Sequence, residues 1–512
     1  MWISPLFIFF LSLIFRITNL NLIEFKGDEA TNLYLAARPI FGHPMPYGGT
    51  VSSVGILNPP IFNYMLFPFT LVSLDPKIIS FMIGFLNSVI IVCFFLILKK
   101  FHNEKLAFIT ASLLALSPWA IVYSRKIWPQ DFILFLIVPL LYSIYKLREN
   151  NMKYWIPYSA ISLFLIQLHQ SGLFFVPLLT LFLILGKIKI NLKLVLIGII
   201  IGLIPLIPYL SYEKSNSCPD CKAYEAAKSS LSGRFPLIFA RPMQILSQGD
   251  FQFLLYDDMA KFSVNFPVAY KLRQLFYLEY LLLPLGLVLF WIKNKKYRFF
   301  VYLSIFLPIL YFLASIVPHM HYFIVVLPIL FLFLSYSLYS LMFNKSVYLK
   351  YFGNLLFLSI LVTSFIFNFS FFDFVSQKKN IDGDYGTIFS ITETKAKDYL
   401  KGYEKDPKYN EMLLASYIPR NIYGDSTLGK MLYSYERTKS QLPVLEERLK
   451  KVPVDTTVQN ELIAFYSSKP PTQQTINLLK KKSEEIKGYK IVLEEITKLY
   501  QSNLQQKNNS HS

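Results

Sequence analysis

The stretch "IISFMIGFLNSVIIVCFFLIL", residues 78–98, contains no charged side chain and reaches the ~20 apolar residues that a helix needs to cross a membrane. Inside the hydrocarbon core every backbone polar group must be bonded within its own segment, so the run is predicted to be helical. Ten further runs are similar. We predict eleven spans, at 3–20, 78–98, 105–121, 131–147, 155–168, 171–186, 192–210, 275–292, 299–316, 321–342 and 351–372. The predicted fold is an all-α polytopic membrane protein.

Composition agrees with this class. Of 512 residues, 54% are hydrophobic and 17% aromatic, which is too apolar for a soluble domain of this size. The first run has no Lys or Arg before it and no small-residue cleavage site after it, which favours an uncleaved span over a signal peptide. Three cysteines exclude a disulfide scaffold, although Cys218 and Cys221 in "CPDC" are spaced for one local disulfide.

The short loops predict the orientation. One alternating set ("KKFHNEK", "KLRENNMK", "GKIKINLK", "KNKKYR" and "FNKSVYLK") is rich in Lys and Arg, whereas the other set has only Arg125 and Lys126. Basic loops stay in the cytoplasm. The N-terminus is therefore predicted inside, and the loops 21–77 and 211–274 outside the cytoplasmic membrane. Much of the net charge of +19 is this retention signal, so nucleic acid is not implied.

The same orientation divides the chain into a membrane domain, 1–372, and an extracytoplasmic domain, 373–512. All large polar segments then lie on one face of the membrane. We find no internal repeat and almost no ionisable residue in the middle of a span. This pattern favours an enzyme working at one membrane surface, with a transporter or flippase of lipid-linked glycans as the alternative.

The first outer loop opens with "GDEATNLYLAA", residues 27–37, which has helical spacing. Asp28 is predicted at the N-cap, where free backbone amides favour a carboxylate. Asp28 and Glu29 therefore have two interpretations, as a helix cap with a solvated neighbour or as chemically active carboxylates. The following "NPPIFNYMLFPFTLVS" is interrupted by Pro59 and Pro60, so we expect it to lie along the membrane interface.

Several segments resemble the GT-C glycosyltransferases, specifically the protein O-mannosyltransferases, the lipid A aminoarabinose transferases and RgtA-like bacterial proteins. The matching segments are "GDEATNLYLA", "NPPIFNYMLFPF", "YSRKIWPQDFILFL", "LHQSGLFFVPLL" and "HMHYFIVVLPILF". The resemblance covers roughly residues 5–340 and includes no part of the last 140 residues.

The resemblance implies transfer of a sugar from a polyprenyl-phosphate donor to a lipid, glycan or protein acceptor at the outer face, in one inverting displacement. It implies that Asp28 is the base that takes the acceptor proton and that Glu29 orients the acceptor or Asp28. A glycan polymerase or ligase with a longer donor is a further alternative. The sequence identifies neither the sugar nor the acceptor.

The leaving phosphate needs cations, and Arg125 and Lys126 are predicted to bind it or, alternatively, lipid headgroups. Arg234 and Arg241 are weaker candidates. His319 and His321, which border the tenth predicted span, have three interpretations. They bind the donor phosphate or sugar, they hold a divalent metal ion together with Glu29, or they make ordinary hydrogen bonds at the membrane interface. No metal ligand is assigned because a two-residue spacing is not a metal signature. The predicted donor-phosphate and substrate-binding residues are Arg125, Lys126, Lys26, Arg38, Asn58, Tyr64, His169, His319, His321 and Tyr322.

The polar tail is predicted to form a small domain, mostly helical or α+β. "TETKAKDYLKGY" and "PPTQQTINLLKKKSEEIKG" have amphipathic helical patterns, whereas "GYKIVLEE" is predicted as a strand. Both a stabilising cap and an acceptor-recognition domain fit this pattern.

Overall fold

The computed structural model describes residues 3–52, 55–228, 234–247, 249, 251–418, 427–468 and 471–509. In this part of the chain the regular structure is helical, with three isolated β-bridges and no strand. The chain divides into two compact units, residues 1–395 and 396–512. The predicted domain limit at 372/373 stays a prediction. The last long helix of the first unit ends a few residues later, at Lys378.

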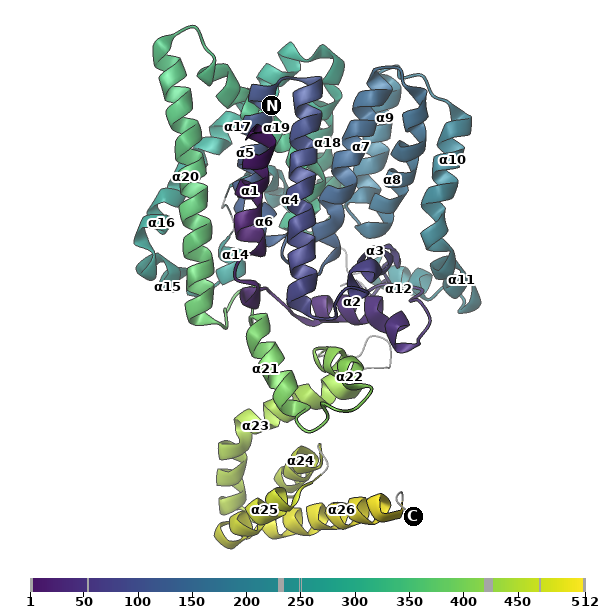
Figure 1. The fold of residues 1–512 in the computed structure, drawn as a ribbon, viewed down its shortest axis with the longest axis vertical. Coiled ribbons are helices and arrows are strands. Elements are labelled where there is room, and N and C mark those ends of the chain that lie inside the picture. The colour runs from purple at the N-terminus through teal and green to yellow at the C-terminus, as the bar shows by residue number, and fades with distance from the viewer. Residues whose placement is uncertain are drawn as a thin grey trace. The chain divides into compact units, whose positions relative to one another are not determined.

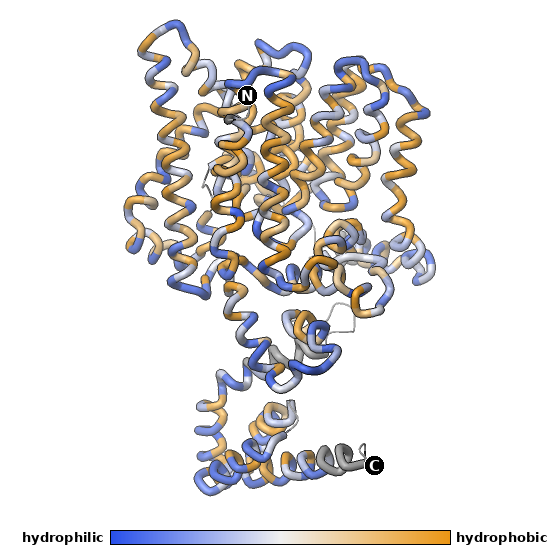
Figure 2. Tube along the Cα trace, viewed as in Figure 1, coloured by the Kyte–Doolittle hydropathy of each residue, from blue (hydrophilic) through white to orange (hydrophobic). Residues whose placement is uncertain are grey.

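The first unit is a bundle of long apolar helices (Figure 1). Figure 2 shows that these helices are hydrophobic over most of their length, with hydrophilic residues at the turns. The bundle helices are α1 (Ile3–Ile17), α4 (Pro76–Phe101), α5 (Glu104–Leu116), α7 (Ile133–Arg148), α8 (Trp155–Leu168), α9 (Gly172–Leu185), α10 (Leu192–Leu203), α17 (Tyr277–Lys293), α18 (Phe299–Leu313), α19 (Leu327–Met342) and α20 (Val347–Lys378). The all-α membrane fold class is thereby confirmed.

Among the described residues, seven helical segments are long and apolar enough to cross a membrane. They are Pro76–Phe101, Pro129–Arg148, Leu192–Ser215, Pro267–Lys293, Lys295–Leu313, Met320–Met342 and Val347–Lys378, and each contains or overlaps a predicted span. The other four predicted spans coincide with α1, α5, α8 and α9, which are shorter. At 13 residues, α5 extends only about 20 Å, because Pro118 disfavours helix at the preceding Ser117 and starts a new short helix.

Shorter helices gather at one end of the bundle. Figure 1 places α2, α3 and α12 together at the end of the bundle opposite to the start of α1. The helices outside the long bundle are α2 (Gly27–Ala37), α3 (Ile61–Thr70), α6 (Pro118–Val122), α11 (Ile207–Ser215), α12 (Pro219–Lys228), α13 (Arg241–Gln244), α14 (Gln252–Leu255), α15 (Asp258–Asn265) and α16 (Pro267–Leu272). Cys218 and Cys221 form the predicted disulfide at the start of α12.

In the described residues of the second unit all regular secondary structure is helical, and the unit has its own apolar core. Its helices are α22 (Tyr409–Ser416), α23 (Thr427–Lys451), α24 (Thr456–Ser467), α25 (Gln473–Glu485) and α26 (Tyr489–Asn509), and α21 (Phe389–Tyr399) leads into it. The predicted strand at 488–495 is wrong. Tyr489, Val492 and Ile496 are all buried, and this spacing of three and four residues lines one face of a helix.

Candidate active site

The first turn of α2 differs from the prediction in one detail that matters for Asp28. The helix starts at Gly27 with Lys26 as the N-cap. Glu29, three residues after the cap, accepts a 2.9 Å hydrogen bond from the backbone N–H of Lys26, as the glutamate of a capping box does. The predicted N-cap role of Asp28 is therefore wrong. Asp28 is the second residue of the helix, and its exposed side chain does not cap the helix.

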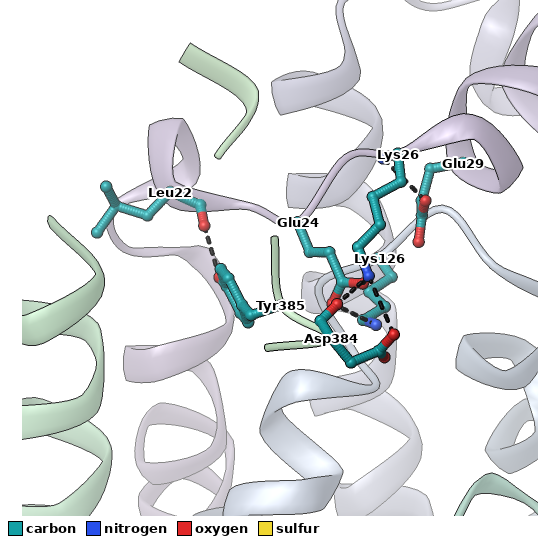
Figure 3. A network of polar contacts seen from close by, with 7 residues as sticks. All are labelled: Leu22, Glu24, Lys26, Glu29, Lys126, Asp384 and Tyr385. Atoms are coloured by element: carbon teal, nitrogen blue, oxygen red, sulfur yellow. Dashed lines mark hydrogen bonds and ion pairs between the residues drawn. The ribbon is translucent and has the colours of Figure 1, made fainter. Parts of the chain in front are cut away.

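Two lysines and two carboxylates from distant segments meet beside this helix end (Figure 3). We call Glu24, Lys26, Lys126 and Asp384 the ionic cluster. Glu24 is 3% exposed and forms ion pairs with both lysines, at 2.7 Å to Lys26 Nζ and more closely to Lys126 Nζ. Lys26 Nζ also donates to the backbone carbonyl of Asp384 and lies 3.4 Å from Asp384 Oδ1. The cluster therefore joins the loop 21–77, the loop before α7 and the segment after α20.

Backbone pairing holds Glu24 in place. Glu24 forms an antiparallel bridge with Ile388, and the N–H of Phe389 donates to the carbonyl of Ile23 at 3.0 Å. Lys126 is held by its surroundings too, since its ammonium group lies 5.1 Å from the ring centre of Trp128. A buried cation is stable only when it is paired, and here Glu24 and an aromatic face provide the pairing.

Burial and the charges of the cluster together shift the pKa values of Lys126 and of the neighbouring Glu29. Burial lowers the pKa of Lys126, but the nearby carboxylates, Glu24 foremost, outweigh burial and raise it. Lys126 is therefore a permanent cation. Burial, assisted by the charge of Glu24, raises the pKa of Glu29 to about 7, although Lys126 and Lys26 oppose the rise.

Asp28 lies in the same electrostatic field. Its side chain is exposed, yet partial removal of water by the surrounding protein raises the pKa of this carboxyl. The positive charges of Lys26 and Lys126 pull its pKa down, and the negative charges of Asp384 and Glu24 push it up. A carboxylate with a raised pKa is a stronger base than an ordinary surface aspartate.

A cavity of about 170 Å³, the site cavity, opens beside the cluster. It combines aromatic rings, two histidines, one guanidinium and one carboxylate. The lining residues are Tyr123, Trp128, Arg241, Phe253, His319, Met320, His321 and Asp384. Burial, with the charge of Arg241, lowers the pKa of His319, although Asp384 opposes this. A lowered pKa favours the neutral form of His319, which can both donate and accept a hydrogen bond.

The predicted histidines converge at this cavity. The ring of His321 lies 5.3 Å from that of His319, 5.4 Å from that of His169 and 4.7 Å from that of Tyr322, measured between ring centres. His321 also packs edge-on against Trp128 at 5.1 Å. Residues that are more than 150 positions apart in the sequence thus form one aromatic group.

Three predicted residues, Asn58, Tyr64 and Arg38, make other contacts or lie further along the chain. Asn58 donates to the carbonyl of Thr50 at 2.7 Å, and Tyr64 donates to the carbonyl of Pro46 at 2.8 Å. Both contacts brace the first outer loop. Arg38 follows the last residue of α2, about 15 Å along the helix axis from Asp28.

Arg125 is buried, and its guanidinium group donates hydrogen bonds to the backbone at the end of the first helix. It donates to the backbone carbonyls of Phe15, Thr18 and Asn19. Its donor-phosphate role stays a prediction. Lys26 contacts Asp384, a residue that lines the site cavity. Arg241 lines the cavity while its Nε donates to the carbonyl of Pro318.

Sequence reasoning missed Glu24, Asp384 and Asp131. Asp131 is buried directly after the predicted outer loop, and both its carboxylate oxygens are without a hydrogen-bond partner among the described residues. A signal for Asp384 was available in "IDGDYG", residues 381–386, a turn-forming acidic segment soon after the last span. Only the three-dimensional structure shows that it reaches Lys26.

Among the described residues, the positions of possible ligands do not form a binding site for a divalent metal ion. There, no group of three or more His, Cys, Asp or Glu side chains is placed to hold an ion. We therefore derive no step through a metal.

Comparisons with known proteins found matches only among solved structures, since no family model and no curated sequence matches. The chain is similar to an oligosaccharyltransferase from Archaeoglobus fulgidus in complex with Zn and sulfate, at 12% identity and a TM-score of 0.47, covering 80% of this chain and 57% of that one. It is similar to the oligosaccharyltransferase AglB from the same organism, in complex with an inhibitory peptide and a dolichol-phosphate, at 12% identity and a TM-score of 0.47. That match covers 81% of this chain and 59% of the other. The chain thus spans less than two thirds of the length of these proteins.

Proposed function

We propose that this chain is an integral-membrane glycosyltransferase, which moves a sugar from a polyprenyl-phosphate donor to a hydroxyl group of a lipid, glycan or protein acceptor outside the cytoplasmic membrane. The observation that carries this proposal is that the ionic cluster and the aromatic site cavity share Asp384, while the charges of the same cluster act on Asp28. A lipid-linked donor can keep its tail in the membrane while its polar head enters such a site.

The residues of the site divide between the two parts of the donor, its phosphate group and its sugar. Lys26 and Arg241 supply N–H donors for the phosphate group that leaves. Lys126 is more deeply buried and holds Glu24, which in turn orients Lys26. Tyr123 and Trp128 offer flat apolar faces to a sugar ring in the cavity.

The transfer itself needs a base. The acceptor oxygen forms a bond to the anomeric carbon while the bond from that carbon to the phosphate oxygen breaks, and the acceptor proton passes to Asp28. The leaving electron pair remains on the polyprenyl phosphate, so the reaction balances without a further reagent. Displacement from the opposite side inverts the anomeric centre.

The test is the Asp28→Asn variant. Asparagine keeps the size of the side chain and cannot accept the proton, so we expect transfer to fall by ~100-fold or more. The fold should be unaffected, because the capping contact with the N–H of Lys26 is made by Glu29 and not by Asp28. The measurement is sugar transfer from polyprenyl-phosphate donors by the purified protein in liposomes.

Asp75→Asn is the matched control. Asp75 lies in the same outer loop and caps α4 by accepting from the N–H of Lys77 at 2.8 Å, a role that asparagine can fill. It should transfer sugar as the wild type does. Wild-type transfer by well-folded Asp28→Asn would remove Asp28 from the mechanism.

A further inference from the structure

We propose that Asp384 binds the donor sugar, with its carboxylate accepting hydrogen bonds from sugar hydroxyl groups in the site cavity. The proposal rests on the glycosyltransferase function above and adds a residue from beyond the last predicted span. It assigns the segment 380–388 to the substrate site rather than to a linker.

The segment that carries Asp384 is firmly placed. The backbone N–H groups of Asp384 and Tyr385 donate to the carbonyls of Phe253 and Leu254, at 3.0 and 3.1 Å. The Tyr385 hydroxyl donates to the carbonyl of Leu22 at 2.5 Å (Figure 3). A Cβ atom on Gly383 would lie 2.3 Å from the Leu254 carbonyl oxygen, so only glycine permits this close approach. The turn is therefore built against the bundle, which fixes the carboxylate of Asp384.

The carboxylate retains capacity for a ligand. Asp384 lines the site cavity and its side chain is 45% exposed. Within the described residues its ion-pair partner is Lys26, at 3.4 Å from one carboxylate oxygen. An ionised carboxylate has about four acceptor positions, so several remain for other donors.

The surroundings of this carboxylate select the ligand class. Tyr123 and Trp128 line the same cavity and pack against each other, with ring centres 6.3 Å apart and planes inclined by 29°. A sugar ring presents apolar C–H faces to such rings and a rim of hydroxyl donors to an acidic group. Phosphate, in contrast, is repelled by Asp384 and attracted by Lys26. We therefore assign Asp384 to the sugar and Lys26 to the phosphate of one donor.

Asp382 provides a matched control in the same turn. Its side chain is also 45% exposed, but it lies 3.9 Å from Lys261 and 4.0 Å from Lys378 and does not line the site cavity. Asp382→Asn thus removes a charge of the same kind at nearly the same place without touching the proposed sugar site.

The experiment compares binding of three probes by the full chain in detergent: undecaprenyl phosphate and its glucose and mannose derivatives. Asp384→Asn should weaken binding of a sugar-bearing probe by about tenfold or more, because hydrogen bonds to a charged group are lost. Undecaprenyl phosphate should bind at least as tightly as to the wild type, because a negative charge that repels its phosphate is removed. Asp382→Asn should match the wild type with all probes. In transfer assays the loss should appear mainly in KM for the donor.

Two outcomes separate the failure of this inference from that of the proposed function. If the wild type prefers a sugar-bearing probe and Asp384→Asn binds it equally well, or loses bare undecaprenyl phosphate to the same extent, Asp384 does not bind sugar. If the wild type binds none of the probes, the glycosyltransferase proposal fails and the assignment of Asp384 fails with it. Melting temperatures of both variants check that the turn is intact.

Discussion

Glu29 combines two roles within one side chain. It caps α2 through the N–H of Lys26, and it is buried close to Glu24 and two lysines. Its pKa of about 7 lies well above that of an unfolded glutamate, near 4.3. Between these values the folded chain keeps a proton that the unfolded chain has released, so the wild type loses stability as pH rises.

Glu29→Gln should remove this pH dependence. Glutamine does not titrate, and its amide oxygen can still accept from Lys26. From pH 5 to pH 8 the stability of the variant relative to the wild type should rise by an amount on the order of 3 kcal/mol. Denaturation midpoints in detergent at both pH values measure this. Parallel pH curves for the two proteins would show that Glu29 is already ionised in the folded state.

Among the helices, glycine determines how closely neighbours approach. A Cβ atom at Gly286 of α17 would lie 1.9 Å from the carbonyl oxygen of Phe333 in α19. At the same contact, the hydroxyl of Ser337 donates to the carbonyl of Leu282 at 2.6 Å. Small residues and interhelical hydrogen bonds of this kind hold membrane helices together where the hydrophobic effect cannot.

Gly286→Ala should therefore separate α17 from α19. The expected destabilisation is about 1–3 kcal/mol, read from the melting temperature of the purified protein. Leu285→Ala is the control, since Leu285 is adjacent but 45% exposed, and it should change stability little. An equally stable Gly286→Ala protein would contradict the close contact.

The helices that sequence predicts best are those fixed by local pattern. Long apolar runs gave every bundle helix a predicted counterpart, since hydrophobic length is a property of the segment itself. The cap of α2 and the strand expected at 488–495 were wrong because short polar segments fit several local structures. The ionic cluster could not be predicted from the sequence for another reason. Lys26 and Asp384 are 358 positions apart, and only tertiary packing brings them together.

For the whole molecule, the distribution of Lys and Arg predicts that both large outer loops and the second unit lie outside. Reporter fusions at residues 45, 240 and 450 should all indicate the extracytoplasmic face, and a fusion at residue 150 should indicate the cytoplasm. The physical reason is retention of basic loops on the inner side. A cytoplasmic signal at 450 would contradict the odd number of spans.

The ionic cluster also has a consequence for the order of events during synthesis. Lys26 emerges from the ribosome 358 residues before Asp384, which at ~5–20 residues per second is an interval on the order of tens of seconds. Throughout this time Glu24 and Lys126 can neutralise each other, but the turn at 380–388 does not yet exist. A nascent chain therefore inserts its first spans with an unfinished site, and the protein becomes competent only once its last helix is in the membrane.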